Sequence, residues 1–191
     1  VKGLTPGKQY RYRVFAQEVL KHTGYKIIYG SYASTDVYYR KPLTFHTCNP
    51  QAPATSFVMV NDIHGDNKLL EDLMSRCNLT QTDFVLFNGD MLSFINSEDQ
   101  LFKGFMDTAV RLFASEIPMY YARGNHETRG VFATEIQRYF SPCQEHLYYA
   151  FRQGPVYCIV LDTGEDKPDS DIEYAGITQY DLYRTEQSEW L

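Results

Sequence analysis

The stretch FVMVNDIHGDNKLLEDLMSRC, residues 57–77, decides the fold. It begins with a short run of apolar, β-preferring residues and continues with apolar residues at helical spacing. The same order recurs downstream, where DFVLF precedes the helical pattern QLFKGFMDTAVRLFAS and IPMYYA forms a third apolar run. Strands that alternate with helices at this spacing predict βαβ crossovers, and therefore an α/β fold with a mainly parallel sheet and helices on its faces.

Polar side chains follow each of the three apolar runs, in the blocks VMVNDIHGD, VLFNGDM and YYARGNHE. The carboxyl ends of parallel strands lie at one edge of a sheet, so we expect these blocks to converge where open α/β folds bind ligands. Their candidate metal ligands are Asp62, His64, Asp90 and Asn125. Mixed nitrogen and oxygen ligands of this kind suit zinc, manganese or iron.

The spacing of these residues also indicates separate roles. Asp62 and His64 are two residues apart, so on an extended segment they project to the same side and reach one cation. Asp90 has two oxygens with which to bridge to a second cation, and Asn125 adds a neutral carbonyl oxygen. His126 follows Asn125 directly and should point differently, which suits an acid that protonates a leaving alkoxide, or a phosphate contact, better than a ligand.

Other polar residues near these blocks have alternative interpretations. Arg123 could contact phosphate or form an ion pair, and Glu127 could hold its neighbours in place or simply be solvated. Asp66 precedes a helical pattern and is expected to cap it. Asp162 is expected to be a cap or turn residue rather than a ligand. The acidic run EDKPDSD, residues 165–171, is expected to be a solvated loop rather than a calcium site.

Composition excludes several classes of protein. The 191-residue chain is 43% hydrophobic and 22% charged, which is ordinary for a globular protein. Its net charge of −6 argues against a nucleic-acid scaffold or a binder of anionic membranes, because such surfaces carry a cationic excess. No apolar run reaches the roughly 18 residues of a transmembrane segment. The N-terminus does not resemble a signal peptide, so we expect the chain to start inside a larger protein.

The four cysteines, Cys48, Cys77, Cys143 and Cys158, contain no CxxC pair, so a zinc knuckle or a thioredoxin motif is not expected. The alternative is that the four cysteines form two disulfide bonds. Cys77 lies on the apolar side of a helical pattern and Cys158 lies in an apolar strand. Both positions favour a buried free thiol.

The regions on either side of the βαβ pattern are predicted to be strands and loops. KQYRYRVFAQEV alternates polar and apolar residues, which predicts a half-exposed antiparallel strand, and PLTFHT is a second strand signal. We expect the tyrosines of residues 10–39 to pack on a strand face rather than to bind carbohydrate or a partner. HLYYAFRQGPVYCIVLDT predicts two strands joined in a hairpin, and the polar C-terminal stretch ends in the beginning of a helix.

The blocks DIHGD, NGDM and RGNHE, each after an apolar strand, resemble the D-x-H, G-D and G-N-H-E blocks of the calcineurin-like metallophosphoesterases. GLTPGKQYRYRV followed by PLTFHT resembles the last strands of a fibronectin-type-III-like β-sandwich, a layout similar to that of purple acid phosphatases. The resemblance implies a partial sandwich at residues 1–47, a linker at 48–55 and an incomplete metallophosphoesterase core at 56–191. That core would have a mainly parallel or mixed sheet with flanking helices.

This resemblance also implies a function, the metal-dependent hydrolysis of phosphate esters by a metal-activated hydroxide at a dinuclear site. The cofactors would be two divalent or trivalent ions of manganese, iron or zinc. Asp62, His64 and Asp90 would hold the first ion, and Asp90 and Asn125 the second. His126 would be the catalytic acid or a phosphate contact. A phosphate ester would be the partner molecule, and a secreted or periplasmic location follows by analogy.

Substrate contacts are implied for Asn125, His126 and Arg123. Two residues depart from the purple enzymes, because His64 replaces a different residue and Ser93 stands where they carry a tyrosine. The purple colour is therefore not expected. The family also uses a later lone histidine and a G-H-x-H block, and the remaining histidines, His22, His46 and His146, lie in no such block. We therefore expect a chain truncated at both ends with an incomplete metal site; the alternative is an inactive binding or scaffold module with a relic site.

Overall fold

The computed structural model describes residues 3–36, 38–140 and 146–191. At its centre lies a parallel sheet in which β6 is paired on both edges. The three strands of this sheet are β5 (Phe57–Val60), β6 (Phe84–Asn88) and β7 (Met119–Ala122). β6 is the most deeply buried of them because it has a strand on each side. The parallel sheet predicted from the sequence is confirmed.

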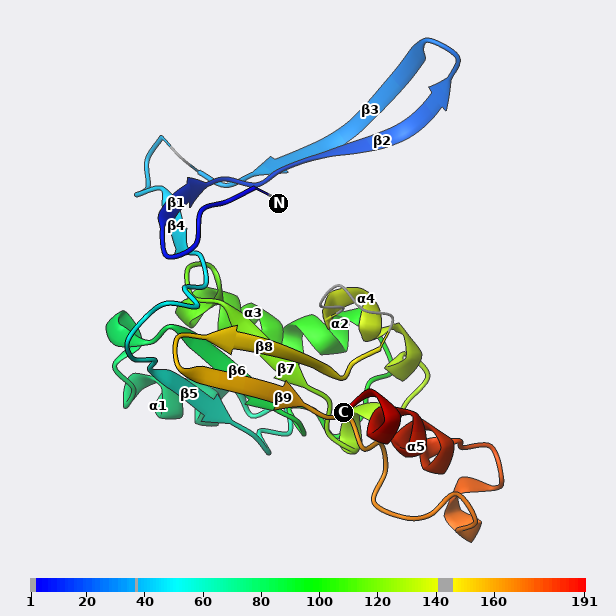
Figure 1. The fold of residues 1–191 in the computed structure, drawn as a ribbon. Helices are drawn as coiled ribbons and strands as arrows, with labels where there is room; N and C mark the ends of the chain where they lie inside the picture. Colours follow the sequence, from blue (N-terminus) through cyan, green and yellow to red (C-terminus); the bar gives the residue numbers. More distant parts are fainter. Residues whose placement is uncertain (1–2, 37, 141–145) are drawn as a thin grey trace.

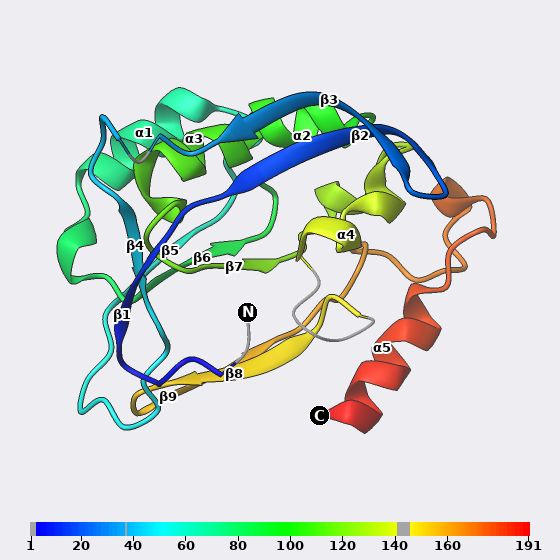
Figure 2. The same ribbon diagram turned by 90° about the horizontal axis from the view of Figure 1, so that it is seen from above.

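Helices cover one face of this sheet (Figure 2). α1 (Asn67–Ser75) connects β5 to β6, and Asp66 caps it as expected by accepting the N–H of Leu69 at 2.9 Å. The second connection is a continuous helix that consists of α2 (Glu98–Leu101), α3 (Asp107–Ala109) and π-helical turns at Phe102–Met106 and Val110–Ala114. None of the helices in the described ranges combines the length and the apolar character needed to cross a membrane.

The other face of the sheet is covered by an antiparallel hairpin (Figures 1 and 2). It consists of β8 (Tyr149–Gln153) and β9 (Val156–Val160), joined at the turn that the sequence predicts. Phe151 on β8 stacks on Tyr120 of β7 with ring centroids 3.7 Å apart and meets Phe84 edge-on at 5.3 Å. The described core is therefore layered, with helices, parallel sheet and hairpin in that order.

The last helix, α5 (Tyr180–Trp190), follows the polar C-terminal loop, as the sequence predicts. Its Gln187 is buried, donates from Nε2 to the carbonyl of Asp162 at 2.5 Å and accepts the Asp162 N–H at 2.8 Å. This side chain joins α5 to the loop after β9. The remaining helical segments are short: α4 (Gln137–Phe140) and 3-10 turns at Leu79–Gln81, His126–Thr128, Ala133–Glu135 and Ile172–Tyr174.

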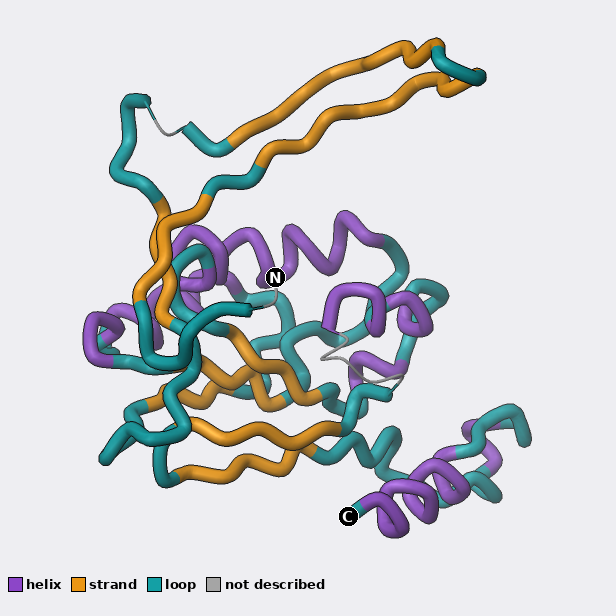
Figure 3. Tube along the Cα trace, turned by 45° about the horizontal axis from the view of Figure 1, so that its top comes forward, coloured by secondary structure: helices purple, strands orange, loops and turns teal. Residues whose placement is uncertain are grey.

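The N-terminal region forms two separate antiparallel pairs of strands. β1 (Gln9–Tyr12) pairs with β4 (Leu43–His46), and β2 (Phe15–Thr23) pairs with β3 (Lys26–Ser34). The β2–β3 hairpin projects away from the core (Figures 1 and 3). The single strand predicted for KQYRYRVFAQEV is wrong, because residues 13 and 14 separate β1 from β2. β3 was not predicted from the sequence, because its tyrosines obscure the alternation of polar and apolar residues.

The N-terminal tyrosines have two different environments. Tyr10 and Tyr12 pack on Phe45, with ring centroids 5.9 and 5.8 Å from it, as expected for a strand face. Tyr25 in the hairpin turn is 101% exposed, so packing does not account for it in the described structure. Tyr32 on β3 is 71% exposed but lies against Phe15 of β2, with ring centroids 6.1 Å apart. The complete sandwich stays a prediction.

The N-terminal strands contact the core through hydrogen bonds. Thr44 on β4 donates from Oγ1 to Glu116 at 2.9 Å, and Thr55 donates to the carbonyl of Gln153 at 2.7 Å. The cysteines described by the structure, Cys48, Cys77 and Cys158, are free. Cys77 and Cys158 are half-buried rather than fully buried, and Cys143 lies outside the described residues.

Replacing Phe87 by Ala should lower the free energy of unfolding by about 3–5 kcal/mol. Phe87 is 0% exposed and packs edge-on against Phe105 and Phe113 at 5.6 and 5.8 Å, so the change leaves a cavity in the core. Urea denaturation gives the difference. The matched control is Phe15→Ala on the hairpin, where the ring is 60% exposed and the loss should stay below about 1 kcal/mol. Equal losses would contradict this account of the core.

Candidate metal centre

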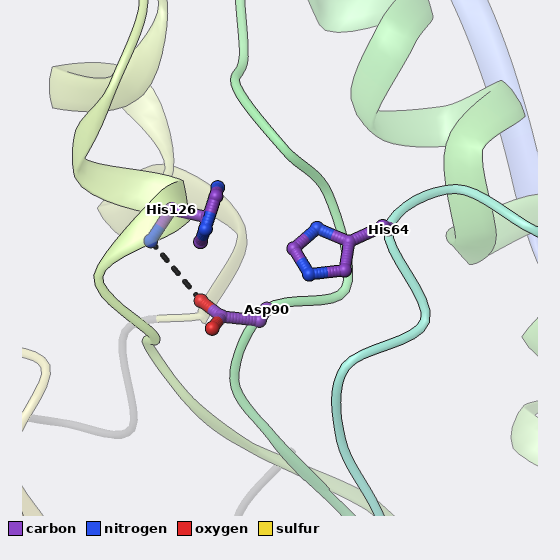
Figure 4. A group of neighbouring side chains, drawn as sticks. All are labelled: His64, Asp90 and His126. Atoms are coloured by element: carbon purple, nitrogen blue, oxygen red, sulfur yellow. Dashed lines mark hydrogen bonds between the residues drawn. The ribbon is translucent and has the colours of Figure 1, made fainter.

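His64, Asp90 and His126 come together from the ends of β5, β6 and β7 (Figure 4). One potential ligand atom from each side chain lies within 4.8 Å of the other two. The rings of His64 and His126 meet edge to face, with centroids 4.6 Å apart. The expected convergence of three strand ends thus places these three candidate residues in one group.

The backbone of this group is in an uncommon conformation. Asp62, His64 and Asp90 have φ angles of 57°, 50° and 55°, in the left-handed region that non-glycine residues seldom adopt. Such strain costs about 1–3 kcal/mol per residue and collects at functional sites. Backbone hydrogen bonds maintain it, since Asp62 N–H donates to the Gly89 carbonyl at 3.2 Å and His64 N–H donates to that of Asp90 at 3.0 Å.

The segment of Asp62 and His64 is therefore a turn, and the extended geometry assumed from the spacing of these residues is wrong. Asp62 nevertheless lies beside His64, with Oδ1 3.7 Å from Nε2. Its other oxygen accepts from the Asn61 amide at 2.6 Å. Among the described residues the compact group contains His126 in place of Asp62, so the ligand role of Asp62 stays a prediction.

Glu127 joins the loops that carry these residues. Its carboxylate is 0% exposed and accepts the backbone N–H groups of Asp90, Leu92 and Gly124, each at 2.9 Å. Burial raises the pKa of Glu127, and the three hydrogen bonds oppose that rise. Of the two interpretations of Glu127, the structure supports the one in which it holds its neighbours in place.

Two glycines allow the same loops to approach closely. Gly89 has φ +84°, and a Cβ there would lie 2.7 Å from the Cα of Gly124. A Cβ on Gly124 would lie 2.2 Å from Oδ1 of Asp90. The glycines of the NGDM and RGNHE blocks are therefore required by packing between the two strand ends.

Ser93 contacts both histidines. Its carbonyl lies 3.1 Å from Nδ1 of His126, and its Oγ lies 3.1 Å from Nδ1 of His64. Nη1 of Arg129, which only donates, lies 3.2 Å from the same Nδ1 of His126 and 3.5 Å from its Nε2. Nδ1 therefore faces both an acceptor and a donor, and these contacts do not fix which ring nitrogen carries the hydrogen. The backbone N–H of His126 donates to Oδ1 of Asp90 at 3.0 Å (Figure 4). The sequence indicated Ser93 only as the residue that stands where the purple enzymes carry a tyrosine.

The side chain of Asn125 binds a carboxylate that the sequence did not indicate. Its Nδ2 donates to Glu165 at 3.2 Å, and Arg129 binds the same carboxylate through Nε at 2.6 Å and Nη2 at 2.9 Å. The Arg129 guanidinium lowers the pKa of Glu165 to about 2, against the opposing effect of burial. Glu165 is 8% exposed, so the expectation of a solvated loop is wrong for this residue. The only feature of the sequence that pointed to Glu165 was its position shortly after an apolar strand.

Arg123 is bound to a second carboxylate of the same loop. Its Nη2 lies 2.9 Å from Oδ2 of Asp162, which is 0% exposed and also accepts from the hydroxyl of Tyr183 at 3.1 Å. Asp162 therefore has a structural role, as expected. The arrangement favours the ion-pair interpretation of Arg123, because a contact with phosphate would require this pair to open.

An open cavity of about 410 Å³ adjoins His64. Its lining includes His64, Leu92, Ser93, Phe94 and Lys103. Phe94 is 48% exposed, so an apolar ring and a cationic side chain lie beside the candidate metal ligands. The volume lies within the range of about 300–1,000 Å³ that is usual for small-molecule sites.

A family model for calcineurin-like phosphoesterases matches residues 55–190. The chain belongs to the calcineurin-like phosphoesterase family. No match was found among curated proteins. Among solved structures, the chain is similar to a purple acid phosphatase from yellow lupin (Lupinus luteus) seeds, with a TM-score of 0.58 and 17% identity over 93% of this chain. It spans 34% of the lupin chain, and at this identity the likeness shows the fold alone.

The side chains present fit the metal ions that a calcineurin-like phosphoesterase implies. Two imidazoles and a carboxylate supply nitrogen and oxygen donors, which suit zinc, manganese or iron. The amide oxygen of Asn125 would add a neutral donor. His146 lies apart from these donors, with Nε2 3.2 Å from Glu186 and its ring stacked on Tyr148.

Replacing Glu127 by Ala should lower the free energy of unfolding by about 3 kcal/mol or more, because three buried or partly buried backbone N–H groups lose their acceptor. Glu127→Gln should lose less, since its amide keeps one acceptor oxygen. Chemical denaturation of both variants measures the effect.

Glu135→Ala is the matched control for this change, because its side chain is half-exposed and pairs with Arg138 on the surface. It should cost less than about 1 kcal/mol. A Glu127→Ala variant as stable as this control would show that the carboxylate does not fasten the two loops.

Proposed function

We propose that this chain carries the metal-binding part of a hydrolase of phosphate esters that acts through two metal ions and uses water as the nucleophile. The observation that carries the proposal is the meeting of His64, Asp90 and His126 at three strand ends of a calcineurin-like phosphoesterase domain. Bound first-row metal ions would lower the pKa of water and polarise the phosphoryl oxygens.

The candidate ligands are arranged so that each is held before a cation binds. One oxygen of Asp90 accepts the His126 N–H, which orients the carboxylate and leaves its second oxygen free. Ser93 orients His64 through its hydroxyl. Such outer contacts commonly fix the direction of metal ligands and raise their affinity. Together with Asp62 and Asn125, these side chains would supply the donors for two cations.

His126 lies against both Ser93 and Arg129, and a ring nitrogen directed at the site serves one role at a time. With Nδ1 directed at the Ser93 carbonyl, Nε2 would either bind a cation or exchange a proton with the leaving alkoxide. We propose the acid role or a phosphate contact, in agreement with the interpretation from the sequence. Its place beside His64 makes a ligand role the competing interpretation.

The substrate would be a phosphate ester whose organic group lies in the cavity beside His64. Phe94 and Leu92 offer apolar surface there, and Lys103 offers a positive charge that is only weakly held by the exposed Asp99. The phosphoryl group itself would lie among His64, Asp90 and His126.

Asp90→Asn should reduce both metal content and phosphate-ester hydrolysis by about a hundredfold or more, because Asp90 is shared by the proposed ion sites. The assay uses p-nitrophenyl phosphate and bis-p-nitrophenyl phosphate with manganese, zinc or iron, together with elemental analysis. Asp66→Asn is the matched control, since Asn caps α1 about as well as Asp and leaves the site untouched. A wild-type protein that binds no metal and hydrolyses neither ester would support the relic-site alternative.

His126→Ala distinguishes the acid from the ligand. If His126 is the acid, metal content is unchanged, and esters of poorly leaving alkyl alcohols lose about a hundredfold in kcat or more. The p-nitrophenyl ester loses much less, because its leaving group needs little protonation. A fall in metal content, with equal losses for both esters, would make His126 a ligand and contradict the proposed role.

A further inference from the structure

We propose that Glu165 is a positioning residue for the metal centre, which holds the Asn125 amide so that its oxygen is presented to a cation. The inference rests on the proposed function, because it assigns Asn125 the role of a metal ligand. Glu165 belongs to the loop after β9 and lies 40 residues from Asn125 in the sequence. Only the tertiary structure brings the two side chains together.

The chemistry of the contact fixes the orientation of the amide. An ionised carboxylate accepts hydrogen bonds and donates none, so the group of Asn125 that faces it must be the NH₂. Nδ2 lies 3.2 Å from Oε2 of Glu165. The oxygen and nitrogen of an amide diverge from its trigonal carbon, so with Nδ2 on Glu165 the Oδ1 atom points in another direction, and among the described residues it has no hydrogen-bond partner. If the amide were rotated by half a turn, Oδ1 of Asn125 would face Oε2 of Glu165, and neither oxygen could donate a hydrogen bond.

Glu165 is itself held in place. Arg129 binds both of its oxygens, through Nε at 2.6 Å and Nη2 at 2.9 Å, and such bidentate pairs have a fixed geometry. The Thr128 hydroxyl lies 3.2 Å from Oε1 of Glu165 and 2.7 Å from the carbonyl of Asn125. The carboxylate is 8% exposed and has little freedom to turn toward another partner.

The partners of Glu165 indicate positioning rather than support of the fold. Within the described part of the chain, the side chains that bind it are those of Asn125, Thr128 and Arg129, and all of them belong to the segment after β7 that also carries His126. The Arg123–Asp162 pair already joins the same two loops deeper in the protein, where Asp162 is 0% exposed and also binds Tyr183. Arg129 is more exposed than Arg123, so the Glu165 pair is the outer of the two.

The test is calorimetric titration of the protein with Zn²⁺ and with Mn²⁺, for the wild type, Glu165→Ala and Glu165→Gln. Glu165→Ala should weaken binding of one ion about ten- to a hundredfold and leave the other ion unchanged. Glu165→Gln keeps an oxygen that accepts from Asn125 and should recover part of the loss. Glu135→Ala, which removes the same charge from a surface pair with Arg138, should bind both ions as the wild type does.

A second measurement needs no metal. The side-chain NH₂ signals of Asn125 in a ¹⁵N-correlated NMR spectrum, assigned by their absence in Asn125→Asp, should shift in Glu165→Ala far more than in Glu135→Ala. Unchanged signals, or unchanged affinities for both ions in Glu165→Ala, would overturn the inference alone. A wild-type protein that binds neither ion would overturn the proposed function and the inference with it.

Discussion

The buried carboxylate of Glu127 is the interaction on which the arrangement of the candidate site depends. It accepts N–H groups from the loop after β6 and from the loop after β7, so the ends of two parallel strands share one acceptor. A buried carboxylate is costly unless its hydrogen bonds are satisfied, and here the backbone satisfies it. The loops are thus held at a fixed distance, which places Asp90 beside His126.

The same site carries considerable strain and several buried charges, and the surrounding structure stabilises both. Three residues at the strand ends have left-handed backbone angles, and backbone hydrogen bonds between the loops after β5 and β6 hold them in this conformation. Two ion pairs, Arg123–Asp162 and Arg129–Glu165, join the loops after β7 and β9. The geometry of the candidate ligands is therefore a property of the folded protein itself, as is expected where a site is arranged before it binds a ligand.

Local patterns in the sequence determined the parallel sheet, its two helical connections, the β8–β9 hairpin and the cap at Asp66. Each of these follows from the periodicity or turn chemistry of adjacent residues, which a sequence displays directly. The candidate residues His64, Asp90 and His126 were also visible, because each follows an apolar run and parallel strands end at one edge. Their shared location follows from topology and needs no knowledge of side-chain contacts.

Tertiary structure alone decided how those residues are held. The burial of Glu127, the contacts of Ser93 with two histidines and the link from Glu165 to Asn125 join positions some 30 to 40 residues apart. No local period reports such pairings, so Glu165 was assigned to a solvated acidic run although it is buried. The turn at Asp62 and His64 was predicted to be extended because its left-handed angles depend on hydrogen bonds that these two N–H groups donate to carbonyls at the neighbouring strand end. Sequence therefore determined which side chains gather at the edge of the sheet, and long-range packing decided their orientation.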